Sequence, residues 1–140
     1  MPLSSGKGAM SNTLPKVCEK TYTVTDDLAV HFMGAAAPPV LSTPALLLWM
    51  EMTSRECVNE LLQSGQDTVG VSVTLKHLAA TPVGQQVRVV SKLVGIEGRI
   101  YSFEIEAFDE AEKIGEATHQ RAAVLVAKFS ERVRAKAKSS

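Results

Sequence analysis

Along this 140-residue chain, the pattern of apolar and polar positions has first the period of a strand, then that of a helix, then that of strands again. Residues 16–27 alternate loosely and are rich in Thr and Val, which predicts a first strand. Residues 31–41 are rich in Gly, Ala and Pro and predict a loop. Residues 43 to about 63 are nearly all apolar in their first half, which predicts a long buried helix. Pro44 suits its first turn, and Gly65 suits its end.

Four strands are predicted after the helix. Residues 68–78 alternate strictly, and the apolar face carries Val69, Val71, Val73 and Leu75. Further strands are predicted at 86–97, 100–109 and 114–128, with short turns between them. One strand, one helix and four antiparallel strands predict an α+β fold in which a curled five-stranded sheet wraps one central helix. The lack of βαβ alternation excludes a Rossmann-type fold.

Composition narrows the class of protein. Lys plus Arg and Asp plus Glu number 15 each, so we expect no nucleic-acid partner, which would call for a basic face. No apolar stretch reaches the ~18 to 20 residues of a membrane span, and the N-terminus lacks the apolar middle of a secretion signal. We therefore expect a cytoplasmic protein. Cys18 and Cys57 show no metal-ligand or CxxC spacing, which predicts two free thiols in a reducing compartment.

The two ends of the chain differ from its middle. Residues 1–14 are small, polar and rich in Gly and Ser, which predicts a disordered segment before a folded domain at 15–129. Residues 130–140 predict a basic, flexible tail. The cations of this end are Lys128, Arg132, Arg134, Lys136 and Lys138. A solvated end explains them, and so does a contact with the phosphates of a coenzyme.

Glu51 lies inside the apolar run 45–52, at a position where a hydrophobic core would normally have an apolar side chain. An ion pair with Arg55, four residues on, explains it, and so does a general base or nucleophile whose burial tunes its pKa. His77 follows the apolar face of its strand, which is expected to pack on the helix of Glu51. It is either a satisfied core histidine or the proton-transfer partner of a carboxylate.

Thr43 stands at the start of the helix, where its hydroxyl can cap the free amides. If Ser42 caps the helix instead, Thr43 is free to face a substrate. Thr43 and Glu51 are eight residues apart, or ~12 Å along a helix. A site that contains Thr43, Glu51 and His77 therefore predicts that a second subunit supplies one of them.

Gly70 interrupts a strand of β-branched residues, which indicates a bulge or a place where a backbone N–H approaches a ligand. His119 and Arg121 have small neighbours on their strand face, which makes them candidate substrate-binding residues or members of a solvated, paired face. The three histidines show no HxxxH or HExxH spacing, and no phosphate-binding glycine loop is present. We expect no metal and no separate cofactor.

Several short motifs occur in a specific order: PVLSTP at 39–44, Met50-Glu51, TVGV at 68–71, KHLAATPVG at 76–84 and GEATHQR at 115–121. They resemble the hotdog-fold thioesterases, in particular the fluoroacetyl-CoA thioesterase-like branch, over about residues 16–128. The predicted order of strands and helix is also that of the hotdog fold.

The resemblance implies hydrolysis of an acyl-CoA thioester by a homodimer with its site at the dimer interface and without a metal. Thr43, Glu51 and His77 match the catalytic residues of the family, and Gly70 and Arg121 match positions that line or support the site. Attack by Glu51 or Thr43 and attack by a water that Glu51 activates both stay open, with His77 handling the proton. Coenzyme A enters only as part of the substrate.

One departure concerns the acyl group. The fluoroacetyl-specific enzyme has aromatic residues in the loop before the helix, whereas residues 33–39 here carry none after Phe32. This predicts an acyl group other than fluoroacetyl, with larger groups among the candidates. Two other functions fit the fold: a hydratase or dehydratase, and a non-catalytic acyl-CoA binding module. Hydratases of this fold usually have a histidine followed by a Pro-rich segment, which His31 and Pro38-Pro39 match only in part.

Overall fold

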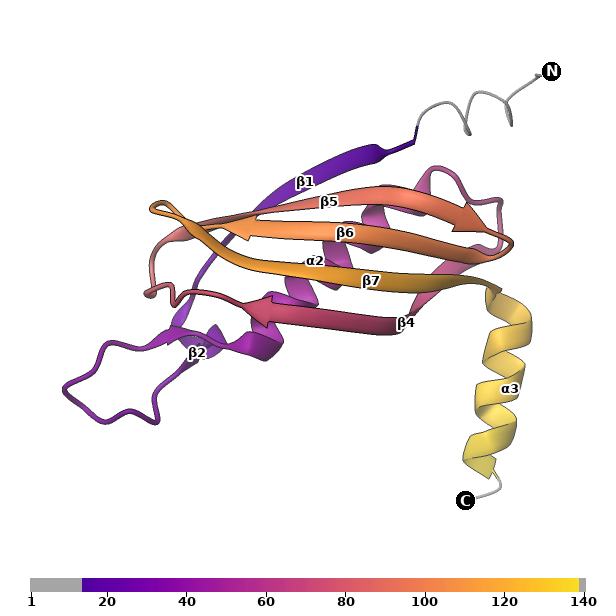
Figure 1. The fold of residues 1–140 in the computed structure, drawn as a ribbon. Coiled ribbons are helices and arrows are strands. Elements are labelled where there is room, and N and C mark those ends of the chain that lie inside the picture. Colours follow the sequence, from indigo (N-terminus) through magenta and orange to yellow (C-terminus); the bar gives the residue numbers. More distant parts are fainter. Residues whose placement is uncertain (1–13, 139–140) are drawn as a thin grey trace.

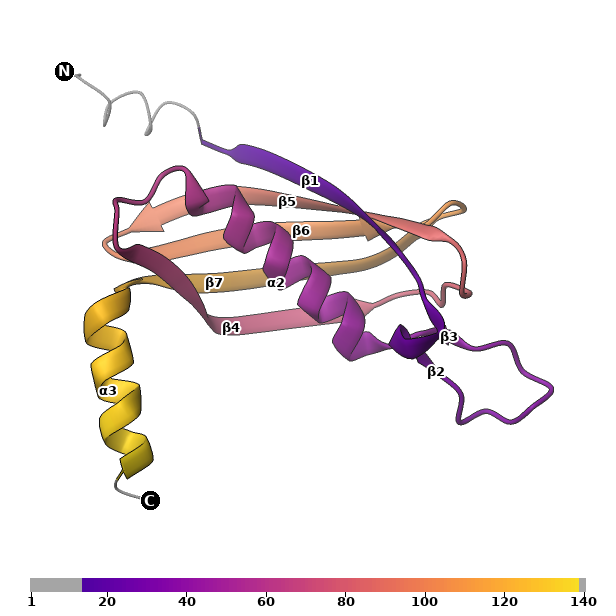
Figure 2. The ribbon, with the colours of Figure 1, turned by 180° about the vertical axis from the view of Figure 1, so that it is seen from behind.

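One long helix, α2 (Thr43–Asn59), lies across one face of a five-stranded antiparallel sheet (Figures 1 and 2). The computed structural model describes residues 14–138, so the predicted disordered segment lies almost wholly outside the described residues. The strands lie side by side in the order β1-β5-β6-β7-β4. Their bounds are β1 Lys16–Thr23, β4 Gln66–His77, β5 Gln86–Glu97, β6 Ile100–Phe108 and β7 Lys113–Leu125. This confirms the predicted architecture.

Apolar side chains on the inner face of the sheet bury the helix. Leu46, Met50 and Val58 of α2 are completely buried, and Leu93 and Phe103 of the sheet lie in the same core. The helix ends at Asn59 instead of continuing to about residue 63. The next residues form a tighter turn of the 3-10 type, in which the Leu61 N–H donates to the carbonyl of Val58, three residues back.

A small second sheet holds the base of the loop before α2. A short 3-10 helix, η1 (Asp26–Leu28), precedes β2 (Ala29–Val30), which pairs antiparallel with β3 (Val40–Leu41). The predicted loop at 31–41 is thus a loop between two short strands. It projects from the end of the domain where α2 begins (Figure 2).

The C-terminal region differs from its prediction. The last strand ends at Leu125, and α3 (Val126–Lys138) occupies most of the predicted tail. Its Ala, Lys, Arg and Glu residues are strong helix formers, and the Val126 N–H donates to the Gly65 carbonyl at 2.9 Å. Residues 130–138 of the predicted tail are thus helical, and the flexible tail and the domain boundary at 129 stay predictions.

The two cysteines form a disulfide, so the prediction of free thiols is wrong. Cys18 on β1 and Cys57 near the end of α2 are bonded, with Cα atoms 5.6 Å apart. They are 39 residues apart in the sequence, and spacing alone does not indicate that β1 packs along the last turns of the helix. Within residues 14–138, no helix is long and apolar enough to cross a membrane.

Candidate active site

A buried arginine binds one carboxylate oxygen of Glu51. Arg121 Nη1 of β7 donates to Glu51 Oε2 at 3.0 Å, and the side chains are 5% and 33% exposed, respectively. The alternative pairing of Glu51 with Arg55 is wrong, because Arg55 binds both carboxylate oxygens of Asp67. Glu51 Oε1 makes no hydrogen bond within residues 14–138. One oxygen of the carboxylate is therefore fixed, and the other is free to accept a proton.

A network behind Glu51 fixes the arginine. Arg121 donates from Nε to Thr68 Oγ1 at 2.8 Å, from Nη2 to the Thr68 carbonyl at 2.9 Å, and from Nη1 to His119 Nε2 at 3.3 Å. His119 Nδ1 donates to the Ser72 carbonyl at 2.8 Å, so the ring is neutral with its lone pair on Nε2. The His119 ring stacks on Phe103. His119 and Arg121 thus lie together beside Glu51, and His119 contacts Arg121.

Gly70 marks both a bulge and a close approach, the two interpretations that the sequence left open. The β4–β7 register shifts between Gly70 and Ser72, which leaves Val71 without a partner in β7. A Cβ at position 70 would overlap Glu51 Oε2 and lie 3.6 Å from His119 Cε1. Glu51 reaches Arg121 only because position 70 has no side chain.

The bulge also reverses which residues of β4 face the helix. Before it, Thr68 is buried against Arg121. After it, Leu75 packs against the core and His77 contacts the start of α2. The predicted strict alternation, with Val71 on the buried face, is wrong, because Val71 is 56% exposed.

Thr43 and His77 form a second cluster at the opposite end of β4. Ser42 Oγ accepts the Ala45 N–H and caps α2, so the Thr43 hydroxyl is free to contact His77 Nδ1 at 2.8 Å. His77 Nε2 is buried without a hydrogen-bond partner among the described residues. This pair lines a cavity of about 510 Å³ together with Phe32 of the loop before α2. Such a pair is the geometry of a hydroxyl and its base.

The two clusters stay apart within one chain. No hydrogen bond or ion pair in the described part of the chain joins Glu51 to Thr43 or His77. This agrees with the ~12 Å that eight helical residues span. The sequence reasoning missed Thr68, which binds Arg121 through both its hydroxyl and its carbonyl. Its place two residues before Gly70, on the same strand face, is the signal that points to it.

Burial favours the neutral form of both site histidines. Burial lowers the pKa of His77, and the backbone of Ala79 opposes this in part. Burial also lowers the pKa of His119; the Ser72 carbonyl opposes the shift, and the Arg121 charge adds to it. A neutral imidazole can accept a proton, which suits His77 beside the Thr43 hydroxyl.

These shifts predict that the free energy of unfolding falls as the pH drops from about 7 to 5. The unfolded chain, whose histidines have a pKa near 6.5, binds protons that the folded chain rejects until its own lowered pKa values are reached. Urea unfolding between pH 7.5 and 5 measures this slope. His119→Gln should flatten the slope, because it removes one of the two histidines whose pKa burial lowers. A slope of equal size in wild type and His119→Gln would contradict the assignment.

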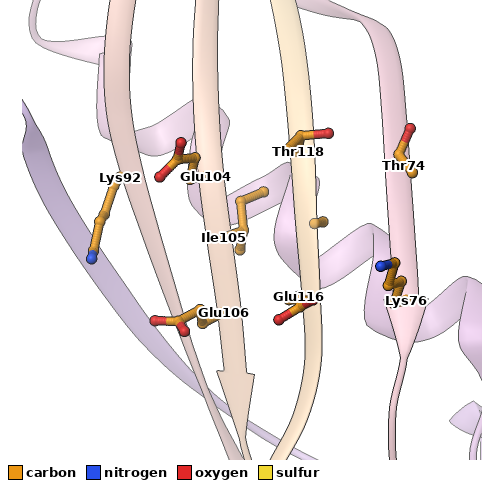
Figure 3. A pocket seen from close by; sticks show the side chains of 9 residues that line it. Thr74, Lys76, Lys92, Glu104, Ile105, Glu106, Glu116 and Thr118 are labelled. Carbon is orange, nitrogen blue, oxygen red and sulfur yellow. The ribbon is translucent and has the colours of Figure 1, made fainter.

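A shallow cavity of about 390 Å³ lies on the face of the sheet opposite α2 (Figure 3). Charged and hydroxyl side chains of β4 to β7 line it, among them Lys92, Glu104 and Glu116 (Figure 3). None of the candidate catalytic residues reaches this face. We therefore place the candidate active site on the helix side of the sheet.

Comparison with known proteins shows the family and the fold of this chain. A family model described as fluoroacetyl-CoA-specific thioesterase matches residues 24–127. The fluoroacetyl-CoA thioesterase of Streptantibioticus cattleyicolor is 34% identical over 102 residues, which are 73% of each chain. The solved structure of the fluoroacetyl-CoA thioesterase FlK is 29% identical, with a TM-score of 0.80 over 87% of this chain and 95% of that one. A hot-dog-like protein from Thermanaerovibrio acidaminovorans, 21% identical, shares the fold with a TM-score of 0.79 over 87% of this chain and 90% of its own.

Proposed function

The chain belongs to the fluoroacetyl-CoA-specific thioesterase family and is an acyl-CoA thioesterase, and we propose that its hydrolytic site combines Glu51, Thr43 and His77 from two subunits. The observation that carries this proposal is the carboxylate of Glu51, fixed by buried Arg121 at one oxygen and free at the other. Membership of this family sets aside the hydratase and the non-catalytic binding module as alternatives.

Glu51 acts as the base that activates water. Oε1 takes a proton from a water molecule while the water oxygen attacks the thioester carbonyl carbon. The negative charge that develops on the carbonyl oxygen is stabilised by a backbone N–H at the bulge of Gly70 and Val71, where β4 leaves the ladder with β7. Arg121 keeps the carboxylate in place throughout.

The Thr43–His77 pair handles the leaving group. When the C–S bond breaks, the thiolate of coenzyme A takes the proton of the Thr43 hydroxyl. Neutral His77 restores that hydroxyl from Nδ1 while its Nε2 takes up the proton that Glu51 removed from the attacking water. Burial lowers the pKa of His77 and so favours the neutral ring that this relay uses. No metal or separate cofactor takes part in this proposal.

The second subunit is expected at the edge of β4. β4 is the last strand of the sheet, and it exposes apolar side chains at Val71 and Val73. An unpaired apolar edge favours pairing with another strand. Antiparallel pairing of two β4 strands would bring the start of one next to the end of the other. It would therefore bring the Glu51 half of one subunit toward the Thr43–His77 pair of its partner.

The acyl group is expected to be larger than fluoroacetyl. The cavity beside Thr43 measures about 510 Å³, and its lining is mainly apolar, with Met33 and Leu78 at its exposed rim. Phe32 itself is 82% exposed and does not close over the cavity. Apolar walls of this extent suit an extended or branched acyl chain.

Thiol release from a panel of acyl-CoAs tests the proposal. We expect kcat/KM to be higher by ~10-fold or more for short branched or medium acyl groups than for fluoroacetyl, because each buried methylene adds about 0.8 kcal/mol. Equal catalysis of fluoroacetyl-CoA and the longer esters would contradict the substrate size. Failure to release thiol from every ester would contradict the proposed site. A cytoplasmic location stays a prediction.

A further inference from the structure

A cavity of about 350 Å³ lies in the angle between α3 and the sheet, away from the proposed hydrolytic site. Lys128, Phe129 and Arg132 reach it from the first turns of α3, and Arg99 reaches it from the hairpin between β5 and β6. Backbone hydrogen bonds fix both walls. The Ala123 N–H donates to the Arg99 carbonyl at 2.8 Å, and the Val126 N–H, at the start of α3, donates to the carbonyl of residue 65. Figure 1 shows α3 leaving the end of β7 and running past the edge of β4.

The cavity is strongly cationic. No acidic side chain lines it; Glu131 lines an adjoining hollow with Lys128 and Arg132. In the described part of the chain, none of its three cations forms an ion pair. Arg99 has only a long hydrogen bond to the Ala123 carbonyl, at 3.4 Å. Positive charges gathered without counter-ions in a concave site favour a multiply charged anion.

An aromatic ring lies among these charges. Phe129 is 41% exposed and faces the cavity. A flat aromatic surface beside arginine side chains favours a ligand that carries both a base and phosphates, since the ring stacks on the base while arginine and lysine bind phosphate oxygens. Simple anions such as sulfate would leave the ring unused.

We propose that this cavity binds the phosphorylated adenosine end of coenzyme A, with Arg99, Lys128 and Arg132 on the phosphates and Phe129 on the adenine. The proposal rests on the proposed thioesterase function and extends it, because it makes the nucleotide a part of substrate recognition. It also predicts a preference for coenzyme A over a carrier that bears the acyl-pantetheine arm without a nucleotide.

The position of the cavity suits a dimer. It lies where β4 begins, whereas His77 lies where β4 ends. Within one chain the cavity is therefore at the far end of the sheet from the Thr43–His77 pair. When two β4 edges pair antiparallel, the cavity of one subunit comes to the side of the partner's catalytic pair. The nucleotide would then be held by one subunit and its acyl end processed beside the other.

Steady-state kinetics of Arg132→Glu with two substrates tests the proposal. For the best acyl-CoA of the panel, KM should rise roughly tenfold or more while kcat stays unchanged, because attraction to phosphate becomes repulsion. For the matching acyl-pantetheine, which lacks the nucleotide, KM should not change. Phe129→Ala should show the same split with a smaller rise.

Arg134→Glu is the matched control, since it makes the same charge change on α3 outside the cavity. An equal rise of KM in Arg134→Glu would overturn the proposal in favour of a general charge effect. So would an unchanged KM in Arg132→Glu, or a rise that is the same for both substrates. If the wild type hydrolyses neither substrate, the proposed function fails. Calorimetry with adenosine bisphosphate then still tests whether the cavity binds the nucleotide. The wild type should bind it, and Arg132→Glu should not.

Discussion

Replacing Glu51 by glutamine is expected to lower kcat by ~10²–10⁴-fold with little change in the shape of the site. The amide oxygen can still accept the hydrogen bond from Arg121, so the side chain keeps its place. It cannot take a proton from water, because an amide is not basic at neutral pH. The measurement is thiol release under saturating acyl-CoA, beside circular dichroism to establish that the variant is folded.

Glu56→Gln is the matched control for this variant. Glu56 lies on the same helix and forms an exposed ion pair with Lys20 at 3.1 Å, far from the sheet face that carries Arg121. It should therefore keep the kcat of the wild type. Glu51→Gln should also unfold more easily, by about 1–3 kcal/mol, because the buried Arg121 charge loses its ionic partner. A variant of Glu51 that keeps full kcat would remove this residue from the mechanism.

The same variant separates the two chemical routes. If water attacks directly, Glu51→Gln releases thiol slowly from the first turnover. If Thr43 attacks first and Glu51 only activates the water that hydrolyses the acyl-threonine, the variant releases one rapid equivalent of thiol per site and then stops. Stopped-flow detection of thiol distinguishes these outcomes, and the mass of the intact chain identifies a trapped acyl group.

The elements with strong local patterns could be predicted from the sequence. The strand at 86–97 has the predicted bounds, and the predicted strand at 100–109 ends one residue early, at Phe108. The start of α2 follows from Ser42 and Pro44, since a cap and an N-terminal proline are local signals. The confirmed topology rests on this succession of periods.

Features that depend on distant contacts could not be predicted in the same way. The bulge at Gly70 is set by pairing with β7, and it reverses the face on which every later residue of β4 lies. The Cys18–Cys57 disulfide depends on how β1 packs on α2, which spacing does not reveal. The residues of α3 are good helix formers, but the residue at which the helix begins is set by where β7 leaves the sheet, and the sequence alone does not reveal it.

In the candidate site, too, local signals could be predicted from the sequence and distant contacts could not. Residue types at the right spacing identified Thr43, Glu51 and His77 as chemically special. The partner of Glu51 was not evident, because Arg55 is its neighbour in sequence whereas Arg121 is its neighbour in space. Sequence proximity predicts pairs within a helix, but the choice between two arginines is made by the sheet that packs against it.

Gly70→Ala is expected to lower kcat by ~10²-fold or more while the chain keeps its fold. The added methyl group would overlap Glu51 Oε2, so the carboxylate must swing away from Arg121. A displacement of about 1 Å at a catalytic group can cost this much in rate. The backbone of Gly70 is not in the left-handed region, and the atom that the methyl group displaces is the end of a flexible side chain, so the fold is kept. Unfolding should become easier by about 1–3 kcal/mol, because the displaced carboxylate leaves the buried Arg121 charge without its ionic partner.

Gly95→Ala provides the comparison that makes this result specific. Gly95 also lies at a register shift, in β5, but a Cβ there meets nothing within 4 Å. Both variants add the same methyl group at a strand irregularity, and only one of them touches Glu51. If Gly95→Ala keeps the wild-type kcat and Gly70→Ala does not, the loss comes from the displaced carboxylate. Shortening the side chain by Glu51→Asp in the Gly70→Ala background relieves the overlap, and the double variant should then lose less activity than the two single losses multiplied.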